Sequence, residues 1–520
     1  MQWPLAAALV VSALFLAART LAGPLTWQVY FRSPVNVESM VGLALTLLLL
    51  LRAKPADVTP TPRNFDAWDA LAILLIAALI AAIFWRAAGV YFLSDDFILL
   101  KQAKSFLYLR ALFATRGGDG SYRPITHLYM HVAYKWAATN PACWHWTEFA
   151  IHAANSILVF LVARMLGFSR FSATFAAALF AVHGTRPEAV VWLAGRADLL
   201  AAFFVLLGLA SFIRFWNRDG GAVWYVISLF SMLLAILSKE SAYTFALLLV
   251  VFLAANGVLK TRRAINALIP FFAVSAALLV WRIILLGGVG GYQNRTGQSE
   301  ALSFGVITLV KALILRLTAI LFFPINWSHQ PNAAFGIVMV LYLATLVWLA
   351  TARVSRNAFI VPLGFLFSLA LPPWSLLLIG PDLQKARVLY LPVLGFCLLL
   401  GTAVENLNWK PRWVVAVSIL AFNVTALFHN LNAWEEAAQK AKAACSAAAA
   451  CPNKVIVSGL PGSLNGVYFF ANGFEECVEM QRNGDSTQFI DRPQSPCILS
   501  WDSRTNELSR ELSRLPYDIH

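Results

Sequence analysis

The stretch GVYFLSDDFILLKQA, residues 89–103, follows a strongly apolar segment at residues 68–88. Its two adjacent carboxylates, Asp95 and Asp96, lie where that segment should leave a bilayer, among aromatic residues typical of a membrane interface. Carboxylates at this depth are costly unless they have a partner or a function, and a positioned carboxylate suits acid–base catalysis. The alternative is an ordinary acidic helix end in headgroup water, and the rest of the chain decides between the two.

The composition is that of an integral membrane protein. Of the 520 residues, 59% are hydrophobic and 13% are charged, and the mean hydropathy is +0.68. Soluble globular domains are far less apolar, so that class is excluded. The formal net charge of +14 could indicate nucleic-acid binding in a soluble protein, but here the basic residues fall mostly in short loops between apolar runs. We therefore expect the lipid bilayer, and no nucleic acid, as a partner.

Apolar runs of spanning length recur from end to end. There are about thirteen of them, which predicts an all-α polytopic membrane protein. The predicted spans are residues 4–21, 36–51, 68–88, 149–166, 171–184, 197–213, 222–238, 241–257, 265–285, 335–351, 358–379, 388–404 and 413–429. Residues 4–18 could alternatively form a signal peptide, but no basic region precedes them, so we predict a retained helix.

Loop charges orient these spans. With the N-terminus inside, every inside loop holds at least two basic residues, as the positive-inside rule requires. These residues are Arg52, Lys54, Arg63, Arg164, Arg170, Arg214, Arg218, Lys260, Arg262, Arg263, Arg353, Arg356, Lys410 and Arg412. Asp95, Asp96 and the C-terminal tail then face outside, the periplasmic side of a bacterial-type plasma membrane. The pattern holds only if residues 301–323, which contain Lys311 and Arg316, lie along the outer surface instead of spanning.

The chain divides into three predicted parts. Residues 1–67 hold two extra N-terminal spans, residues 68–429 form the membrane domain with a first outer loop at 89–148, and residues 430–520 form an outside-facing C-terminal domain. Helix-like and strand-like segments alternate in this last part, which predicts a small α/β appendage.

Cysteine usage agrees with an outside location for the C-terminal domain. Four cysteines there predict at least one disulfide in an oxidising compartment, although free buried thiols are the alternative. They are Cys445, Cys451, Cys477 and Cys497. Pairing along the chain would close one short and one longer loop, and the sequence leaves the connectivity open. Their spacing does not resemble a zinc site, so no metal site is predicted, and a divalent-metal requirement stays open.

Further polar residues cluster at the predicted outer ends of the spans. Arg123 follows the acidic loop, and His152 and Asn155 share one face of the fourth span. The sequence between the fifth and sixth spans contains His183, Arg186, Glu188, Arg196 and Asp198. Two later clusters are SKESA, with Lys239 and Glu240, and DLQKARVLYLP, with Lys385, Arg387 and Tyr390.

These clusters have structural explanations as well as functional ones. His152 and Asn155 could join helices, the second loop could hold the pairs Arg196–Asp198 and Arg186–Glu188, and Arg387 could extend to the interface. We expect both kinds of role, with Glu188 or His183 facing a ligand and basic side chains binding a lipid phosphate. Carboxylates and phosphate-binding cations on one face favour glycosyl transfer from a lipid-phosphate sugar. A carboxylate would deprotonate the acceptor hydroxyl, and cations would stabilise the leaving phosphate.

These motifs resemble the GT-C class of membrane glycosyltransferases, and most closely the TMTC-type O-mannosyltransferases. The matching pieces are LSDDF, SYRP, the His152/Asn155 face, H-x-x-x-x-E-A-V followed by GRADLLA, SKES, and RVLYLPVLGFCLLL, in order over residues 89–404. The resemblance implies a GT-C-like membrane fold, a polyprenyl-phosphate sugar donor and inversion at the anomeric carbon, and its closest members suggest mannose as the sugar. It also implies that Asp95 or Asp96 is catalytic and that Glu188 supports it.

Two features depart from that family: tetratricopeptide repeats do not follow the last span, and two extra spans precede the acidic loop. The acceptor, a protein or a glycan, therefore stays open. The first alternative is a GT-C enzyme that modifies a glycolipid or a surface polysaccharide. The second is a transporter or flippase, which is less favoured because repeated halves and charges near the bilayer midplane are missing from the pattern.

Overall fold

The computed structural model describes residues 2–22, 34–53, 65–104, 121–217, 221–288, 290, 305–355, 357–451, 455–482 and 497–510. Some predicted features lie outside these residues. They are Lys54, Arg63, Arg218 and Arg356 of the inside loops, residues 105–120 of the first outer loop, and residues 301–304 of the predicted surface helix.

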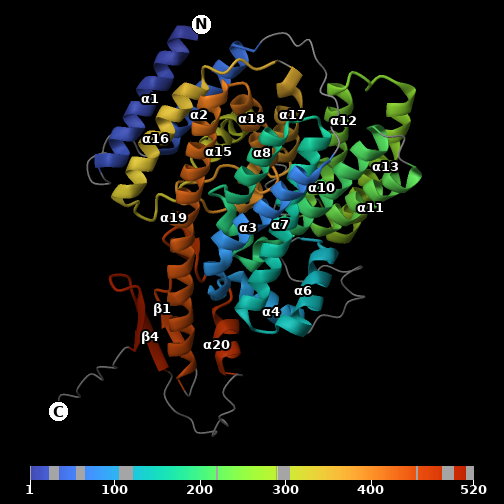
Figure 1. Ribbon diagram of the computed structural model, residues 1–520. Helices are drawn as coiled ribbons and strands as arrows, with labels where there is room; N and C mark the ends of the chain where they lie inside the picture. The colour runs from blue at the N-terminus through green and yellow to red at the C-terminus, as the bar shows by residue number, and fades with distance from the viewer. Residues whose placement is uncertain are drawn as a thin grey trace, which may run out of the picture.

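The described residues are mostly helical, and most helices pack into one bundle (Figure 1). The first half of the bundle contains α1 Gln2–Ala22, α2 Pro34–Leu51, α3 Ala67–Phe84, η1 Trp85–Gly89, α4 Asp95–Lys104, α6 Pro124–Ala137, α7 Pro141–Met165, α8 Arg170–Val182, α9 Arg186–Val190, η2 Leu193–Gly195 and α10 Arg196–Asn217. The second half contains α11 Ala222–Ser238, η3 Glu240–Thr244, α12 Phe245–Ala255, α13 Arg262–Leu286, α16 Ala333–Leu349, η6 Asn357–Phe359, α17 Ile360–Ala370, η7 Trp374–Leu376, η8 Ala386–Leu389, α18 Val393–Glu405 and α19 Trp409–Ala449.

Every predicted span overlaps an apolar helix. Among the described residues, five helices are long and apolar enough to cross a membrane: Ala67–Gly89, Pro141–Met165, Leu193–Asn217, Arg262–Leu286 and Pro411–Ala449. Shorter apolar helices cover the other predicted spans, at Leu5–Leu14, Asn36–Leu51, Arg170–Val182, Ala222–Ser238, Glu240–Ala255, Ala333–Leu349, Asn357–Ala370 and Val393–Glu405. The chain is therefore an integral multi-pass membrane protein, while the number of crossings stays a prediction.

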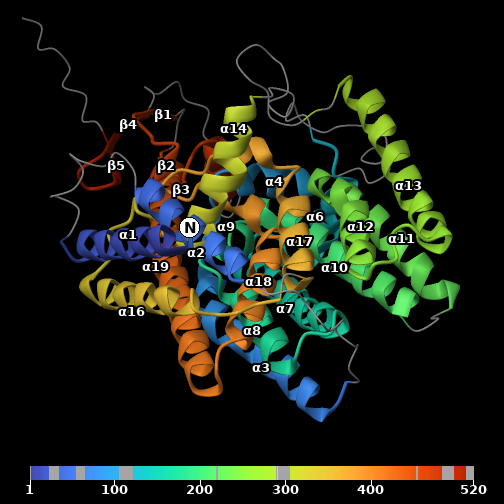
Figure 2. The same cartoon turned by 90° about the horizontal axis from the view of Figure 1, so that it is seen from above.

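Helices α7, α8, α10 and α18 form the centre of the bundle, with α1 and α16 on one side and α11 to α13 on the other (Figures 1 and 2). Close packing in the centre depends on small residues. A Cβ atom on Gly395 of α18 would lie 2.4 Å from Pro362 O and from Leu366 N of α17, so these two helices approach through a glycine.

The loops that we predict to be inside meet at one end of the bundle. Arg164, at the end of α7, donates from Nε to Asp69 Oδ1 of α3 over 2.9 Å, and Arg52 NH1 donates to Ala350 O over 2.7 Å. A cavity at this end is lined from the α7–α8 loop and from the ends of α10, α12 and α18. This grouping is what an alternating topology requires, and which end faces the cytoplasm stays a prediction.

The predicted surface helix is present as one helical segment in three pieces: α14 Val306–Val310, the π-helical η5 Lys311–Arg316, and α15 Leu317–Phe322. It packs on α2, where Ser39 Oγ donates to Leu315 O over 2.8 Å. Within the described residues it is not one of the helices long and apolar enough to cross a membrane. Its position along the outer surface stays a prediction.

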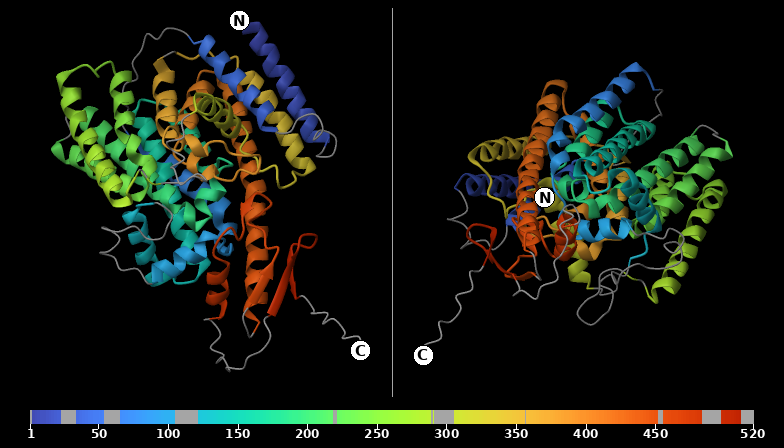
Figure 3. Two further views of the ribbon diagram at one scale, coloured as in Figure 1. Left: turned by 180° about the vertical axis from the view of Figure 1, so that it is seen from behind. Right: turned by 90° about the horizontal axis from the view of Figure 1, so that it is seen from below.

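Helix α19 is longer than the sequence predicts. Its 41 residues run from the bundle into the C-terminal part without a break at 430, the predicted domain boundary (Figures 1 and 3). Beside its second half lies a three-stranded sheet, in which β4 Cys497–Asp502 pairs in parallel with β1 Val455–Ser458 and antiparallel with β5 Glu507–Arg510. This C-terminal part also contains the hairpin of β2 Ser463–Leu464 with β3 Val467–Tyr468 and the helix α20 Phe474–Arg482.

Two disulfides join the C-terminal elements, which confirms the prediction of at least one. Their connectivity differs from pairing along the chain, because Cys445 bonds to Cys477 and Cys451 bonds to Cys497. The first ties α20 to α19, and the second ties β4 to the end of α19. The folded positions of α20 and β4 therefore decide the pairing, and sequence spacing could not.

Candidate functional site

The acidic loop is held by its neighbours before α4 begins. Asp96 is 2% exposed, and its two carboxylate oxygens accept from the amides of Leu93, over 3.1 Å, and Ala194, over 3.0 Å. Trp192 Nε1 also donates to Leu93 O over 3.0 Å. Asp96 therefore ties the first outer loop to the segment after α9.

The two adjacent acids have different surroundings. Burial raises the pKa of Asp96 well above its ordinary value, while its two amide partners and the charge of Arg196 oppose the rise. Asp95 is half-buried and accepts at Oδ1 from Asn472 Nδ2 over 2.8 Å. Asp95 is thus the more accessible of the pair, and Asp96 has the contacts of a residue that holds the loop.

Glu188 and Arg387 form a buried ion pair beside this loop. Glu188 is 4% exposed and accepts from the Arg387 guanidinium and from the backbone amides of Lys385, over 3.1 Å, and Arg387, over 3.3 Å. The guanidinium carbon of Arg387 also lies 4.7 Å from the centroid of the Trp192 ring. Burial raises the pKa of Glu188, and Arg387 opposes the rise.

Two further ion pairs extend this network. Asp198 pairs with Lys239, and Glu240 accepts from Arg123 Nε over 2.9 Å and from its NH2 over 2.5 Å. Arg282 of α13 lies 4.0 Å from Glu240. The charges of Arg123 and Arg387 both act on Lys239, which links the pairs electrostatically. The network joins four cations to three carboxylates, and the exposed Lys385 lies next to it.

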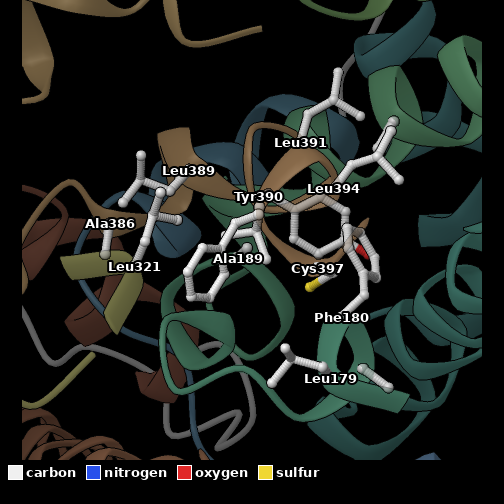
Figure 4. Close-up of a cluster of buried hydrophobic side chains, with 14 of the residues drawn as sticks. Leu179, Phe180, Ala189, Leu321, Ala386, Leu389, Tyr390, Leu391, Leu394 and Cys397 are labelled. Atoms are coloured by element: carbon white, nitrogen blue, oxygen red, sulfur yellow. The ribbon is translucent and has the colours of Figure 1, made fainter. Parts of the chain in front are cut away.

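Three residues that we predict to bind substrate, Tyr390, Arg186 and His183, are buried within the bundle, and their substrate-binding role stays a prediction. The Tyr390 hydroxyl bonds to His152 Nδ1 over 2.7 Å and accepts from Asn155 Nδ2 over 3.1 Å. Arg186, fully buried, donates to Phe180 O over 2.8 Å and to Tyr390 O over 3.1 Å. Figure 4 shows Tyr390 and Phe180 among apolar side chains such as Leu179 and Leu394. Tyr390 is therefore not at an outer mouth, as we predicted, but in the core.

His183 is the third of these residues. It is fully buried; its Nδ1 lies 2.9 Å from Thr185 Oγ1 and its Nε2 lies 3.0 Å from Leu321 O. These contacts join α8 to α15.

The ion pairs proposed within the second outer loop are wrong. Arg196 does not pair with Asp198 but with Glu148 of α7, with NH2 and Oε1 2.9 Å apart. Glu188 pairs with Arg387 instead of Arg186. The reason is that helical backbone at 186–190 and 196–217 turns these side chains toward other elements.

Sequence reasoning missed Glu148, Arg282 and Trp192 as neighbours of the site. Glu148 and Arg282 carried a usable signal, because both are ionisable residues in apolar stretches. Trp192 carried none beyond its place in the second loop. In the described part of the chain, no group of three or more His, Cys, Asp or Glu side chains could hold a metal ion.

No family model matches the chain. Among curated proteins, it is 39% identical to fruit-fly (Drosophila melanogaster) protein O-mannosyl-transferase Tmtc1 over 133 residues, 25% of this chain and 15% of the relative. Mouse (Mus musculus) TMTC3 is 29% identical over 38% of this chain and 22% of the relative, and mouse TMTC4 is 26% identical over 64% and 54%. The chain thus spans at most about half the length of these relatives.

Among solved structures, the chain is similar to the Archaeoglobus fulgidus oligosaccharyltransferase AglB in complex with an inhibitory peptide and a dolichol-phosphate. The TM-score is 0.43 and the identity 13%, over 83% of this chain and 61% of AglB. ArnT from Cupriavidus metallidurans bound to undecaprenyl phosphate has a TM-score of 0.36 and 15% identity, over 83% and 93%. The sequence relatives confirm the resemblance that the motifs indicated: the chain is related, over part of its length, to the TMTC-type protein O-mannosyl-transferases.

Proposed function

We propose that this protein is an inverting membrane glycosyltransferase that transfers a sugar from a polyprenyl-phosphate donor to an acceptor hydroxyl on the outer face. The relatives are named O-mannosyl-transferases, which favours mannose as the sugar and a protein hydroxyl as the acceptor. One observation carries the proposal. A half-buried Asp95 lies on a loop that is tied to Trp192 and Ala194, and Trp192 in turn contacts Arg387 of a cation-rich network.

In this proposal Asp95 is the general base. It accepts the proton of the acceptor hydroxyl as that oxygen bonds to the anomeric carbon, and the bond from this carbon to the phosphate breaks. The electron pair leaves with the polyprenyl phosphate, whose charge the cation-rich network stabilises.

The test is turnover by the purified protein in lipid nanodiscs. It would receive a panel of polyprenyl-phosphate sugars with a serine- and threonine-containing peptide or a glycolipid as acceptor, and released polyprenyl phosphate would be measured. We expect one donor, polyprenyl-phosphate mannose, to be used. Repeating the assay with a chelator would decide the metal requirement.

Matched variants give the assay its control. A positioned general base contributes about 10²–10⁴-fold, so Asp95→Asn should lower turnover by that factor, while the exposed Asp502→Asn in β4 should not change it. Undiminished turnover by Asp95→Asn would reject the proposed mechanism. No release from any donor would reject the function, and a preference for the glycolipid would favour the alternative acceptor class.

A further inference from the structure

The C-terminal part returns to the acidic loop through residues 469–474, which we call the strap. Ser94 N donates to Phe469 O over 3.0 Å, and Asn472 N donates to Ser94 Oγ over 3.3 Å. The side-chain amide of Asn472 then donates to Asp95 Oδ1 over 2.8 Å. The strap therefore contacts both the backbone of the acidic loop and the carboxylate that we propose as the base.

The strap and the loop approach too closely for an ordinary residue at one position. Gly473 has a φ of +80°, and a Cβ atom there would lie 2.3 Å from Ser94 O. Ser94 itself has a φ of +47°. A positive φ is uncommon for a residue with a side chain, and it occurs here at both residues where the strap meets the acidic loop. A side chain at position 473 would therefore disturb this contact.

The strap is fixed at its far end by α20. The disulfide between Cys477 and Cys445 attaches α20 to α19. Gln481 Nε2 donates to the Tyr91 hydroxyl over 2.8 Å, and Lys101 pairs with Glu479 over 2.7 Å. The position of Asn472 is thus fixed by α20, which is bonded to α19 and also contacts Tyr91 and Lys101 on either side of the acidic loop.

From this geometry we infer that Asn472 is a positioning residue for the base, an inference that rests on the proposed function. Its amide occupies Asp95 Oδ1 and so fixes the rotation of the carboxylate, leaving Oδ2 to receive the proton of the acceptor hydroxyl. Asn472 keeps its own protons throughout. It touches the base and not the reacting atoms.

The experiment measures kcat and KM for polyprenyl-phosphate mannose with Asn472→Ala in nanodiscs. A misplaced base slows the chemical step, so kcat should fall by up to about 100-fold while KM stays within error. Asn472→Asp should lose activity as well, because it replaces the donor by a second negative charge. Gln481→Ala is the matched control: it removes a bond from the same C-terminal part to Tyr91 without touching Asp95, and kcat should hold.

Three results would overturn the inference. An unchanged kcat for Asn472→Ala means that the amide does not position the base. A raised kcat means that Asn472 blocks the acceptor position. An equal loss in Gln481→Ala means that general anchoring of the C-terminal part matters, and not this amide. Thermal unfolding of each variant shows whether it is folded, and Asn472→Asp, nearly equal in size, replaces Asn472→Ala if the latter fails to fold.

A double variant separates this inference from the proposed function. If Asn472 acts through Asp95, adding Asn472→Ala to Asp95→Asn should cause no further loss. Full activity of Asp95→Asn alone would refute the catalytic mechanism. A slow Asp95→Asn beside a fully active Asn472→Ala would refute only the positioning role.

Discussion

Arg387 combines a buried ion pair with the role in donor binding that we propose for it. It neutralises Glu188, which has 4% exposure, and it lies over Trp192. Removing one partner of a buried ion pair leaves an uncompensated charge. We expect Arg387→Ala to cost about 3–5 kcal/mol of unfolding free energy, whereas Arg387→Lys keeps the charge and loses the two-pronged geometry.

Thermal unfolding in detergent measures the first effect, and binding of polyprenyl-phosphate mannose measures the second. Arg387→Lys should unfold close to the wild type yet bind the donor more weakly, and the exposed Arg504→Ala should change neither property. Normal donor affinity in Arg387→Ala would show that the phosphate site lies elsewhere.

Asp96 predicts a pH dependence of stability. Its pKa in the folded protein is raised above that of an unfolded aspartate, which is about 3.9. Between the unfolded pKa and the folded pKa, the folded state therefore binds the proton more tightly than the unfolded state does. The resulting stability is present at low pH and is lost as pH rises through the folded pKa. Asp96→Asn removes this component, so its melting temperature should vary less than that of wild type as pH rises above about 4, the pKa of an unfolded aspartate.

The exposed Arg504→Ala is the comparison for this pH experiment, because it changes a side chain in the β4–β5 hairpin and leaves Asp96 and its charged neighbours in place. Its melting temperature should keep the wild-type pH profile. Parallel profiles for Asp96→Asn and wild type would contradict the assignment of this titration to Asp96.

At the scale of residues, the sequence indicated which ionisable residues to consider but not which residues they contact. It identified Asp95, Glu188 and Arg387 because ionisable residues at membrane ends are conspicuous. It assigned Tyr390 to the outer mouth, because the pattern RVLYLP is typical of a membrane interface. In the structure the Tyr390 hydroxyl is hydrogen-bonded to His152 inside the bundle. Side-chain direction depends on packing between distant helices, and no local pattern encodes it.

Elements were predicted well wherever hydropathy alone defines them. The apolar runs became helices, but α19 continues past 430, where hydropathy falls. Its second half is rich in alanine and other strong helix formers, so the helix persists where the apolar run stops. The hairpin β2–β3 was not predicted, because two-residue strands carry almost no periodic signal.

The link between α19 and α20 gives a prediction at the scale of elements. The Cys445–Cys477 bond closes a loop of sequence separation 32, and replacing both cysteines by serine should cost about 2–4 kcal/mol of stability in the C-terminal part. Limited proteolysis should then cut this part first. Without reductant, thiol labelling of wild type should modify Cys143, which is half-buried, and leave the four paired cysteines unmodified.

Cys143 serves as the internal control, since it should react to the same extent in wild type and in the double variant. Labelling of all four C-terminal cysteines in wild type without reductant would contradict both disulfides. Equal protease resistance of wild type and the double variant would show that packing alone holds α20.

In the whole molecule, the two ends of the bundle differ in the charge of their loops and in the elements that pack there. The basic inside loops meet at one end, where Arg164 pairs with Asp69, and the C-terminal part lies at the other end with α4. The positive-inside rule then predicts that the acidic loop, the cation-rich network and the strap lie outside. Reporter fusions after Lys260, after Gly297 and at the C-terminus should therefore read inside, outside and outside.

The fusions after Gly297 and at the C-terminus together test whether residues 301–323 cross the membrane. The C-terminal fusion also tests whether the strap lies on the same side of the membrane as Asp95. If 301–323 crossed the membrane, every later span would reverse and the C-terminus would be cytoplasmic. The strap could then reach Asp95 only if the acidic loop were cytoplasmic too, because Asn472 and Asp95 are in contact. A cytoplasmic C-terminus together with an outside reading at Gly297 would thus contradict both the surface position of 301–323 and the strap contact. An outside C-terminus keeps Asp95, the cation-rich network and the strap on one face, as the proposed glycosyl transfer to an outer acceptor requires.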